Sequence, residues 1–68
     1  MPISARNQIK GTVVSVTKGP ATAIVEVDAG GQRVVASITA EAAEELGLAE
    51  GKDVTAIIKA SDVLLATD

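Results

Sequence analysis

Hydrophobic and polar residues alternate along most of the chain, and this period of two is typical of β-strands. Gly-Pro and Gly-Gly pairs at 19–20 and 30–31 separate the early runs and are typical of turns. A break at Ser61–Asp62 separates the last two runs. The pattern predicts five strands, at residues 5–17, 22–28, 33–39, 52–61 and 63–67.

Residues 40–47 interrupt this pattern and predict one short helix. Thr39 is a suitable N-cap, Glu41 suits the positive end of the helix dipole, and Gly47 suits the position after the helix. The apolar stripe of this helix is expected to be Ala42, Ala43 and Leu46. A glycine within a strand often marks a bend, and Gly11 predicts one in the first strand. The predicted fold is all-β with one short helix, an OB-like five-stranded small β-barrel that is oligomeric.

The strands carry apolar residues on both faces, whereas a sheet with one wet face alternates cleanly. In the first strand Val14 and Val16 are predicted to share the core face. The apolar residues predicted for the opposite face are Val13, Ile24, Val35, Ile57 and Leu64. We expect a partner subunit to bury this second face; the alternative is scattered exposed side chains, which are common on protein surfaces.

The chain has only 68 residues, so its core is small, and it has no cysteine to form a disulfide. We therefore expect it to gain stability by self-association. It has no aromatic residue and a net charge of −3. Both features disfavour nucleic-acid binding, which uses stacking side chains and a basic surface. No stretch resembles a signal peptide or a membrane span, so we expect a cytoplasmic protein with no membrane partner.

Catalysis is disfavoured because histidine, cysteine and tyrosine are all absent. Lys59 and Ser61 would share one face of a strand, as a Ser-Lys dyad requires, but a dyad also needs a cleft and an oxyanion hole. The acidic residues follow no calcium-loop spacing, so we expect no metal-cation site. We therefore expect a protein that is not an enzyme.

Oxyanion binding fits the sequence better, because hydroxyls, accessible backbone amides and a cation together hold an anion. Two triplets near the chain ends offer this set: Ser4, Ala5, Arg6 and Lys59, Ala60, Ser61. A second candidate set comprises Lys18, the amides of Gly19 and Ala21, and the hydroxyls of Ser37 and Thr39. The alternative for each cation is a surface salt bridge, which contributes little to stability.

Three segments together resemble a known family. "SARNQIKG" (4–11), "ITAEAAEELGL" (38–48) and "EGKDVTAIIKASDVLLA" (50–66) are similar to the molbindins, the Mop-type small molybdate-binding proteins that share the TOBE/Mop domain. The resemblance extends from Ile3 to Thr67, so we expect a single Mop domain over residues 1–68. The tetrapeptides SARN and IKAS together, at this separation, are more specific to the family than either one alone.

The resemblance implies an OB-like barrel assembled as a homohexamer, a trimer of dimers. It also implies molybdate or tungstate sites in which the Ser4–Arg6 segment of one subunit meets the Lys59–Ser61 segment of another. A second class of site near the threefold axis maps onto the set around Lys18. Pro20 has no N–H to donate there.

We therefore expect the chain to bind molybdate or tungstate for intracellular molybdenum storage or homeostasis, with no organic cofactor. The alternative is an OB-like module that recognises nucleic acid or a protein partner without specific oxyanion binding. A further alternative is a structural oligomerisation domain of a longer transporter or regulator, although a self-contained chain is expected.

Overall fold

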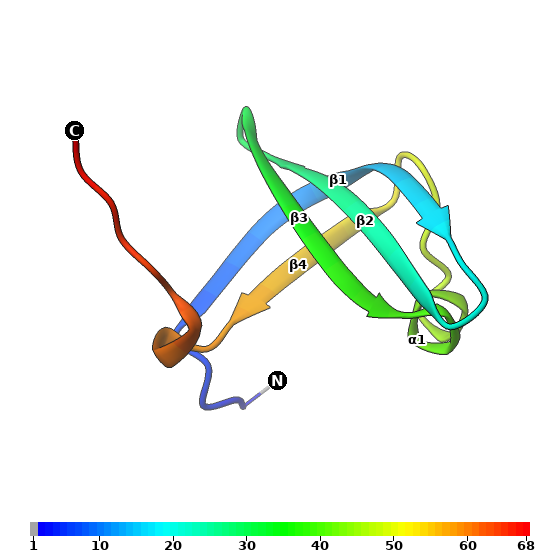
Figure 1. Cartoon of the computed structure of the whole chain (residues 1–68), viewed down its shortest axis with the longest axis horizontal. Helices are drawn as coiled ribbons and strands as arrows, with labels where there is room; N and C mark the ends of the chain where they lie inside the picture. Colours follow the sequence, from blue (N-terminus) through cyan, green and yellow to red (C-terminus); the bar gives the residue numbers. More distant parts are fainter. Residues whose placement is uncertain (1) are drawn as a thin grey trace.

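The computed structural model describes residues 2–68 and shows a mostly β protein with one short helix (Figure 1). The four strands form one antiparallel sheet in the order β3-β2-β1-β4. The elements are β1 (Asn7–Lys18), β2 (Thr22–Ala29), β3 (Gln32–Thr39), α1 (Ala40–Glu45), β4 (Asp53–Ile58) and the 3₁₀ turn η1 (Ala60–Asp62). No helix in residues 2–68 is long and apolar enough to cross a membrane.

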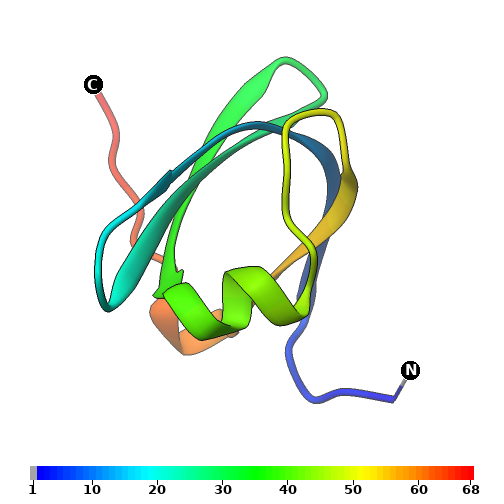
Figure 2. The same ribbon diagram turned by 90° about the vertical axis from the view of Figure 1, so that its right-hand side faces the viewer.

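The long first strand changes partner halfway along its length. From Asn7 to Thr12 it pairs with β4, and from Thr12 to Lys18 it pairs with β2. The sheet curls around this strand, and α1 lies below the curled sheet (Figure 2). Gly11 lies just before the change, where a Cβ atom would come within 2.6 Å of Val27 Cγ1 and 2.7 Å of the Asp28 carbonyl oxygen. The sequence predicted a bend at Gly11, and the structure shows that this glycine allows β1 to approach β2 closely.

An irregularity at Val14 reverses the predicted facing of β1. Val13 pairs with Val27 and Ser15 pairs with Glu26, so Val14 is an extra residue in the ladder between them. Such a bulge shifts the alternation by one residue. Val13 is consequently only 1% exposed and Val14 is 49% exposed. The prediction that placed Val14 on the core face and Val13 opposite was wrong for this reason.

The core is small and made chiefly of valine. Val13, Val25 and Val27 form its buried centre. Half-buried residues from β1, β3, β4 and the loop after α1 pack around them: Val16, Val34, Ala36, Ile38, Leu48 and Val54. The sequence also predicted apolar residues on the opposite face of the sheet. This is confirmed for β2, β3 and β4, where Ile24, Val35 and Ile57 are exposed in the single chain.

The predicted turns and the start of the helix are confirmed. Gly30 and Gly31 both have positive φ (63° and 90°), which suits a two-residue hairpin turn. Thr39 Oγ1 accepts a hydrogen bond from the Ala42 N–H at 3.0 Å, as an N-cap does. Ala43 is buried, but Leu46 is exposed and does not complete the predicted stripe.

The fifth predicted strand is absent from residues 2–68. Val63–Thr67 forms no ladder, and the four-stranded sheet is open, with β3 and β4 at its edges. The fourth strand also ends at Ile58, earlier than predicted, because η1 turns the chain out of the sheet. A segment needs a neighbouring strand to become part of a sheet, and the C-terminal segment points away from the sheet (Figure 1).

Gly11→Ala is expected to destabilise the fold by about 1–3 kcal/mol, the usual range for forcing an extra carbon into a packed site. The added Cβ would collide with the Val27 side chain and the Asp28 backbone. Urea unfolding followed by far-UV circular dichroism measures the change. Gly19→Ala is the matched control, because its nearest contact, the Thr22 carbonyl oxygen, is 3.5 Å away. Equal stability of the two variants would contradict the close approach.

Candidate functional site

The two triplets from opposite ends of the sequence lie at the same end of the β1–β4 ladder. The last pair of that ladder is Asn7 with Ile58, and the triplets are the residues directly outside it. Asn7 Nδ2 also donates a hydrogen bond to the Ile58 carbonyl oxygen at 3.1 Å, which joins the two segments. Each copy of the chain therefore presents both halves of the predicted site at one end of its sheet.

The cations of these triplets are exposed and form no ion pair within residues 2–68. Arg6 directly precedes Asn7 and Lys59 directly follows Ile58, so both cations lie just beyond the last pair of the ladder. Within residues 2–68, no carboxylate lies within 4 Å of either cation. Two exposed cations without a carboxylate partner leave this end of the sheet able to attract an anion.

The remaining members of the triplets differ in their surroundings. Ser4, Ala60 and Ser61 are exposed, whereas Ala5 is buried and its carbonyl oxygen accepts a hydrogen bond from Gln8 Nε2 at 3.4 Å. Lys59 and Ser61 do not share a strand face, because Lys59 precedes η1 and Ser61 lies within it. Both side chains are exposed, and the shared strand face that the sequence predicted for them is not the arrangement observed.

The second predicted set gathers where β1 ends, at the opposite end of that strand. Lys18 pairs with Ala23, and Thr22 pairs with Thr39, so the loop around Gly19 lies beside the end of β3. The Gly19 N–H donates to the Thr22 carbonyl oxygen at 2.7 Å and closes the turn. Of the two amides expected to face an anion, that of Gly19 is thus already used by the turn.

The strand register divides this second set between two faces of the sheet. Residues paired across a ladder point to the same face, so Lys18 shares a face with Ala23 and Ile38. Ser37 pairs with Ile24 and lies on the other face, as does Thr39. Thr39 also accepts the helix-capping hydrogen bond. One chain therefore does not bring the lysine and the two hydroxyls of this set together on one face.

Two other basic side chains have structural partners. The Arg33 guanidinium forms an ion pair with Glu26, donating to Glu26 Oε1 through Nη2 and also through Nε at 3.1 Å. The hydrogen bonds and the positive charge of Arg33 lower the pKa of Glu26 below its ordinary value of 4.5, with a smaller contribution from Ser15. The Lys52 ammonium donates to the Leu46 carbonyl oxygen, which follows the last residue of α1. These two cations are therefore engaged within the fold.

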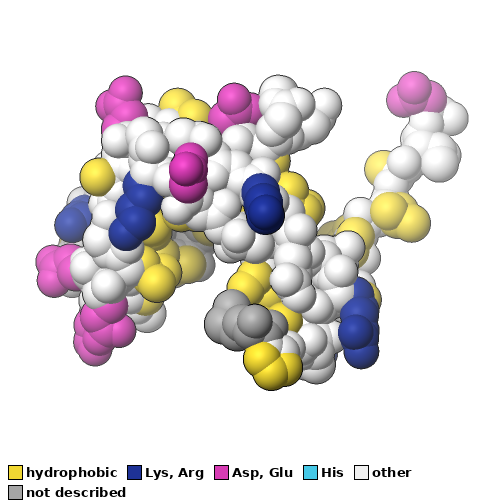
Figure 3. Space-filling model, turned by 180° about the vertical axis from the view of Figure 1, so that it is seen from behind, with side chains coloured by type: hydrophobic (Ala, Val, Ile, Leu, Met, Phe, Trp, Pro, Cys, Tyr) yellow, Lys and Arg dark blue, Asp and Glu magenta, His cyan; other side chains and the backbone are white. Residues whose placement is uncertain are grey.

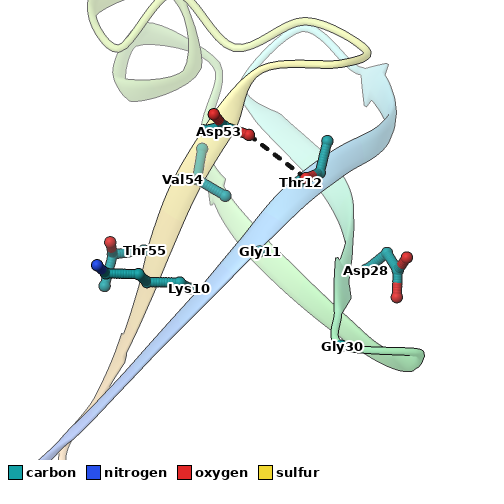
Figure 4. A pocket seen from close by; sticks show the side chains of 8 residues that line it. All are labelled: Lys10, Gly11, Thr12, Asp28, Gly30, Asp53, Val54 and Thr55. Carbon is teal, nitrogen blue, oxygen red and sulfur yellow. Dashed lines mark hydrogen bonds between the residues drawn. The ribbon is translucent and has the colours of Figure 1, made fainter.

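A broad open depression of about 700 Å³ follows the region where β1 changes partner (Figure 4). It is lined by two carboxylates, Asp28 and Asp53, together with Lys10 and Thr12. Thr12 Oγ1 donates to Asp53 Oδ1 at 3.4 Å, whereas Asp28 comes from β2 on the other side. The two carboxylates would repel an oxyanion, so the charge of this depression differs from that of the predicted sites.

The fold defines a small, mostly β protein built on an open four-stranded antiparallel sheet with one short helix. The TOBE domain family matches residues 3–65, and the chain belongs to this family, as a protein of the Mop or molbindin type.

Among its relatives, the molybdenum-pterin-binding protein 3 of Clostridium pasteurianum is 50% identical over 66 residues, which cover 96% of this chain and 97% of the relative. Among solved structures, MopII from Clostridium pasteurianum in an apo form has a TM-score of 0.90 and 43% identity, covering 97% of this chain and all of MopII. A molybdate binding protein from Sporomusa ovata has a TM-score of 0.94 and 36% identity, covering 98% of this chain and all of that one.

Arg33→Gln is expected to raise the pKa of Glu26 towards 4.5, because it removes the hydrogen bonds and the charge that favour the carboxylate. The folded-state pKa is depressed, so the ion pair adds stability above the unfolded pKa and loses it as pH falls through the folded pKa. NMR titration of the Glu26 side-chain carboxyl carbon measures the shift. Lys10→Gln, which removes an equal charge elsewhere, should leave this pKa nearly unchanged. A similar shift in both variants would contradict the local ion pair.

Proposed function

We propose that this protein binds molybdate or tungstate reversibly, in a homo-oligomer, for intracellular storage or homeostasis of the metal. The binding groups are the hydroxyls, amides and cations of Ser4, Ala5 and Arg6 from one copy and Lys59, Ala60 and Ser61 from another. The observation that carries the proposal is the pair of exposed cations, Arg6 and Lys59, directly beyond the last rung of the β1–β4 ladder.

The distribution of basic residues supports this proposal. The chain has six basic residues and a net charge of −3, so an anion is repelled by most of its surface. Arg33 and Lys52 are engaged by Glu26 and by the end of α1. The three cations of the predicted sites, Arg6, Lys18 and Lys59, lie at strand ends with no carboxylate within 4 Å among residues 2–68. Local attraction at these ends would offset the overall repulsion.

The chemistry of the ligand also suits the residue types. Molybdate is a tetrahedral dianion at neutral pH, so it accepts hydrogen bonds and donates none. Hydroxyls, backbone N–H groups, an ammonium and a guanidinium all supply hydrogen-bond donors. The N–H groups and cations cannot accept a hydrogen bond, so only the serine hydroxyls could accept one from the O–H of a protonated phosphate. Sulfate has the same charge and shape as molybdate but is smaller, so discrimination against it requires a cavity of matched size.

Self-association completes the proposed site. The exposed apolar residues on the outer face of the sheet, Ile24, Val35 and Ile57, provide surface for such contacts. A Mop-type trimer of dimers would bring sheet ends of different copies together and would pair the two triplets between subunits. The relatives named for molybdenum-pterin binding and for molybdate binding support the choice of ligand.

Arg6→Ala and Lys59→Ala are each expected to weaken molybdate binding about tenfold or more while leaving the fold intact. Hydrogen bonds to charged groups contribute roughly 1.5–3 kcal/mol, and each 1.4 kcal/mol changes affinity about tenfold. Isothermal titration calorimetry with molybdate, tungstate, sulfate and phosphate measures the effect, and circular dichroism checks the fold.

Lys10→Ala is the matched control for this experiment, since Lys10 is an exposed cation of β1, the strand that follows Arg6, but lines the acidic depression. It should bind molybdate nearly as well as the unaltered chain. Equal weak heats for all four anions would refute specific oxyanion binding. An equal loss of affinity in the Lys10 variant would show that net charge, and no particular site, is responsible.

Native mass spectrometry with and without molybdate is expected to show a homo-oligomer that retains the oxyanion and becomes more resistant to dissociation. A ligand that binds only the assembled form stabilises it by mass action. A folded monomer that binds molybdate at micromolar concentration would refute the shared site, while leaving oxyanion binding itself intact.

A further inference from the structure

Two side-chain amides hold the backbone beside the proposed oxyanion site. Asn7 Nδ2 donates to the Ile58 carbonyl oxygen at 3.1 Å. Gln8 Nε2 donates to the Ala5 carbonyl oxygen through a longer contact of 3.4 Å. Both hydrogen bonds are partly buried. A carbonyl oxygen only accepts hydrogen bonds, so the nitrogen of each side-chain amide faces it, and each bond fixes the direction of one carbonyl group.

These two carbonyls belong to the peptide units that lead into the two cations. The Ala5 carbonyl shares a peptide plane with the Arg6 N–H, and the Ile58 carbonyl shares one with the Lys59 N–H. No peptide bond within residues 2–68 is cis. In a planar trans peptide the C=O and the N–H point in opposite directions. Fixing each carbonyl on one side therefore directs the N–H of the following cationic residue to the other side.

The two N–H groups are accessible to a ligand. Arg6 and Lys59 are exposed, and neither N–H donates to another backbone group within residues 2–68. A peptide N–H is also a stronger donor when the carbonyl of the same unit is hydrogen-bonded, because linked hydrogen bonds polarise one another. Each cation thus comes with a backbone donor that is both directed and strengthened by a neighbouring side chain.

The charge of this end of the sheet suits such a role. Figure 3 shows dark-blue basic atoms here, at lower right, whereas the magenta acidic atoms in view lie over other parts of the molecule. A neutral amide supplies a donor without adding a charge. A carboxylate at position 7 or 8 would repel both the carbonyl oxygen it faces and a bound oxyanion. Asparagine and glutamine are therefore well suited to hold carbonyls next to an anion.

We propose that Asn7 and Gln8 are positioning residues of the oxyanion site. Asn7 directs the Lys59 N–H towards the bound anion, and Gln8 directs the Arg6 N–H. This inference rests on the proposed function and adds two residues that act on the ligand only through the backbone. Each side chain holds a different peptide plane, so the two effects are separable.

NMR titration with molybdate tests the two residues separately. In the unaltered chain the backbone amide protons of Arg6 and Lys59 are expected to move downfield as they donate to the anion. Asn7→Leu keeps the size of the side chain and removes its donor, so it should reduce the Lys59 shift and leave the Arg6 shift. Gln8→Met should do the reverse. A general loss of structure would reduce both shifts in both variants, and that result would overturn the proposal.

Isothermal titration calorimetry gives the corresponding affinities. Asn7→Leu and Gln8→Met are each expected to weaken molybdate binding roughly two- to tenfold, the effect of one lost hydrogen bond. The matched control is Gln32→Met, because Gln32 is an exposed amide side chain of β3 that pairs with Ala29 beside the hairpin turn. This variant should bind molybdate nearly as tightly as the unaltered chain.

The same measurements distinguish the positioning role from the function on which it rests. If the unaltered chain binds molybdate and both variants bind it equally tightly with unchanged amide shifts, the positioning role is overturned and the oxyanion function stands. If the unaltered chain binds no molybdate, both are overturned. Far-UV circular dichroism checks the fold of each variant. Should Asn7→Leu fail to fold, Gln8→Met decides the matter through the Arg6 shift, because the Gln8 side chain is exposed.

Discussion

The change of partner along β1 is the constraint on which the other features of the structure depend. One continuous strand pairs with β4 through its first half and with β2 through its second, and the two ladders meet at Thr12. The turn in direction is possible because Gly11 has no side chain where β1 comes closest to β2. The same geometry brings the N-terminal triplet beside Lys59 and directs Lys18 to the far end of the strand.

Local features of the sequence were sufficient to predict much of this fold. The Gly30–Gly31 turn, the Thr39 cap and the alternation along β2 and β3 each follow from a few neighbouring residues, and all are present. The facing of Val13 and Val14 was mispredicted, because a bulge depends on the partner strand and has no signature in β1 alone. The fifth strand was predicted from its own alternation, but a strand also requires a neighbour.

The residues of the candidate site were recognisable by type, whereas their arrangement was not. Spacing along the chain gives no indication that Arg6 and Lys59 follow the same rung, since that depends on a ladder between residues some fifty positions apart. Nor does the spacing show that Lys18 and Ser37 lie on opposite faces of the sheet. The first triplets are thus joined by tertiary structure within one chain, and the second set is divided by it.

The bulge at Val14 has a consequence for how this chain is compared with others of its fold. Because the extra residue shifts the alternation, Val13 and Val16 both pack on the core although three positions separate them. A homologous chain that lacks this one residue would form a regular ladder here, and the residues from Ser15 to Lys18 would keep their partners and their face of the sheet. An alignment that placed the gap elsewhere would therefore assign each of these residues to the wrong face.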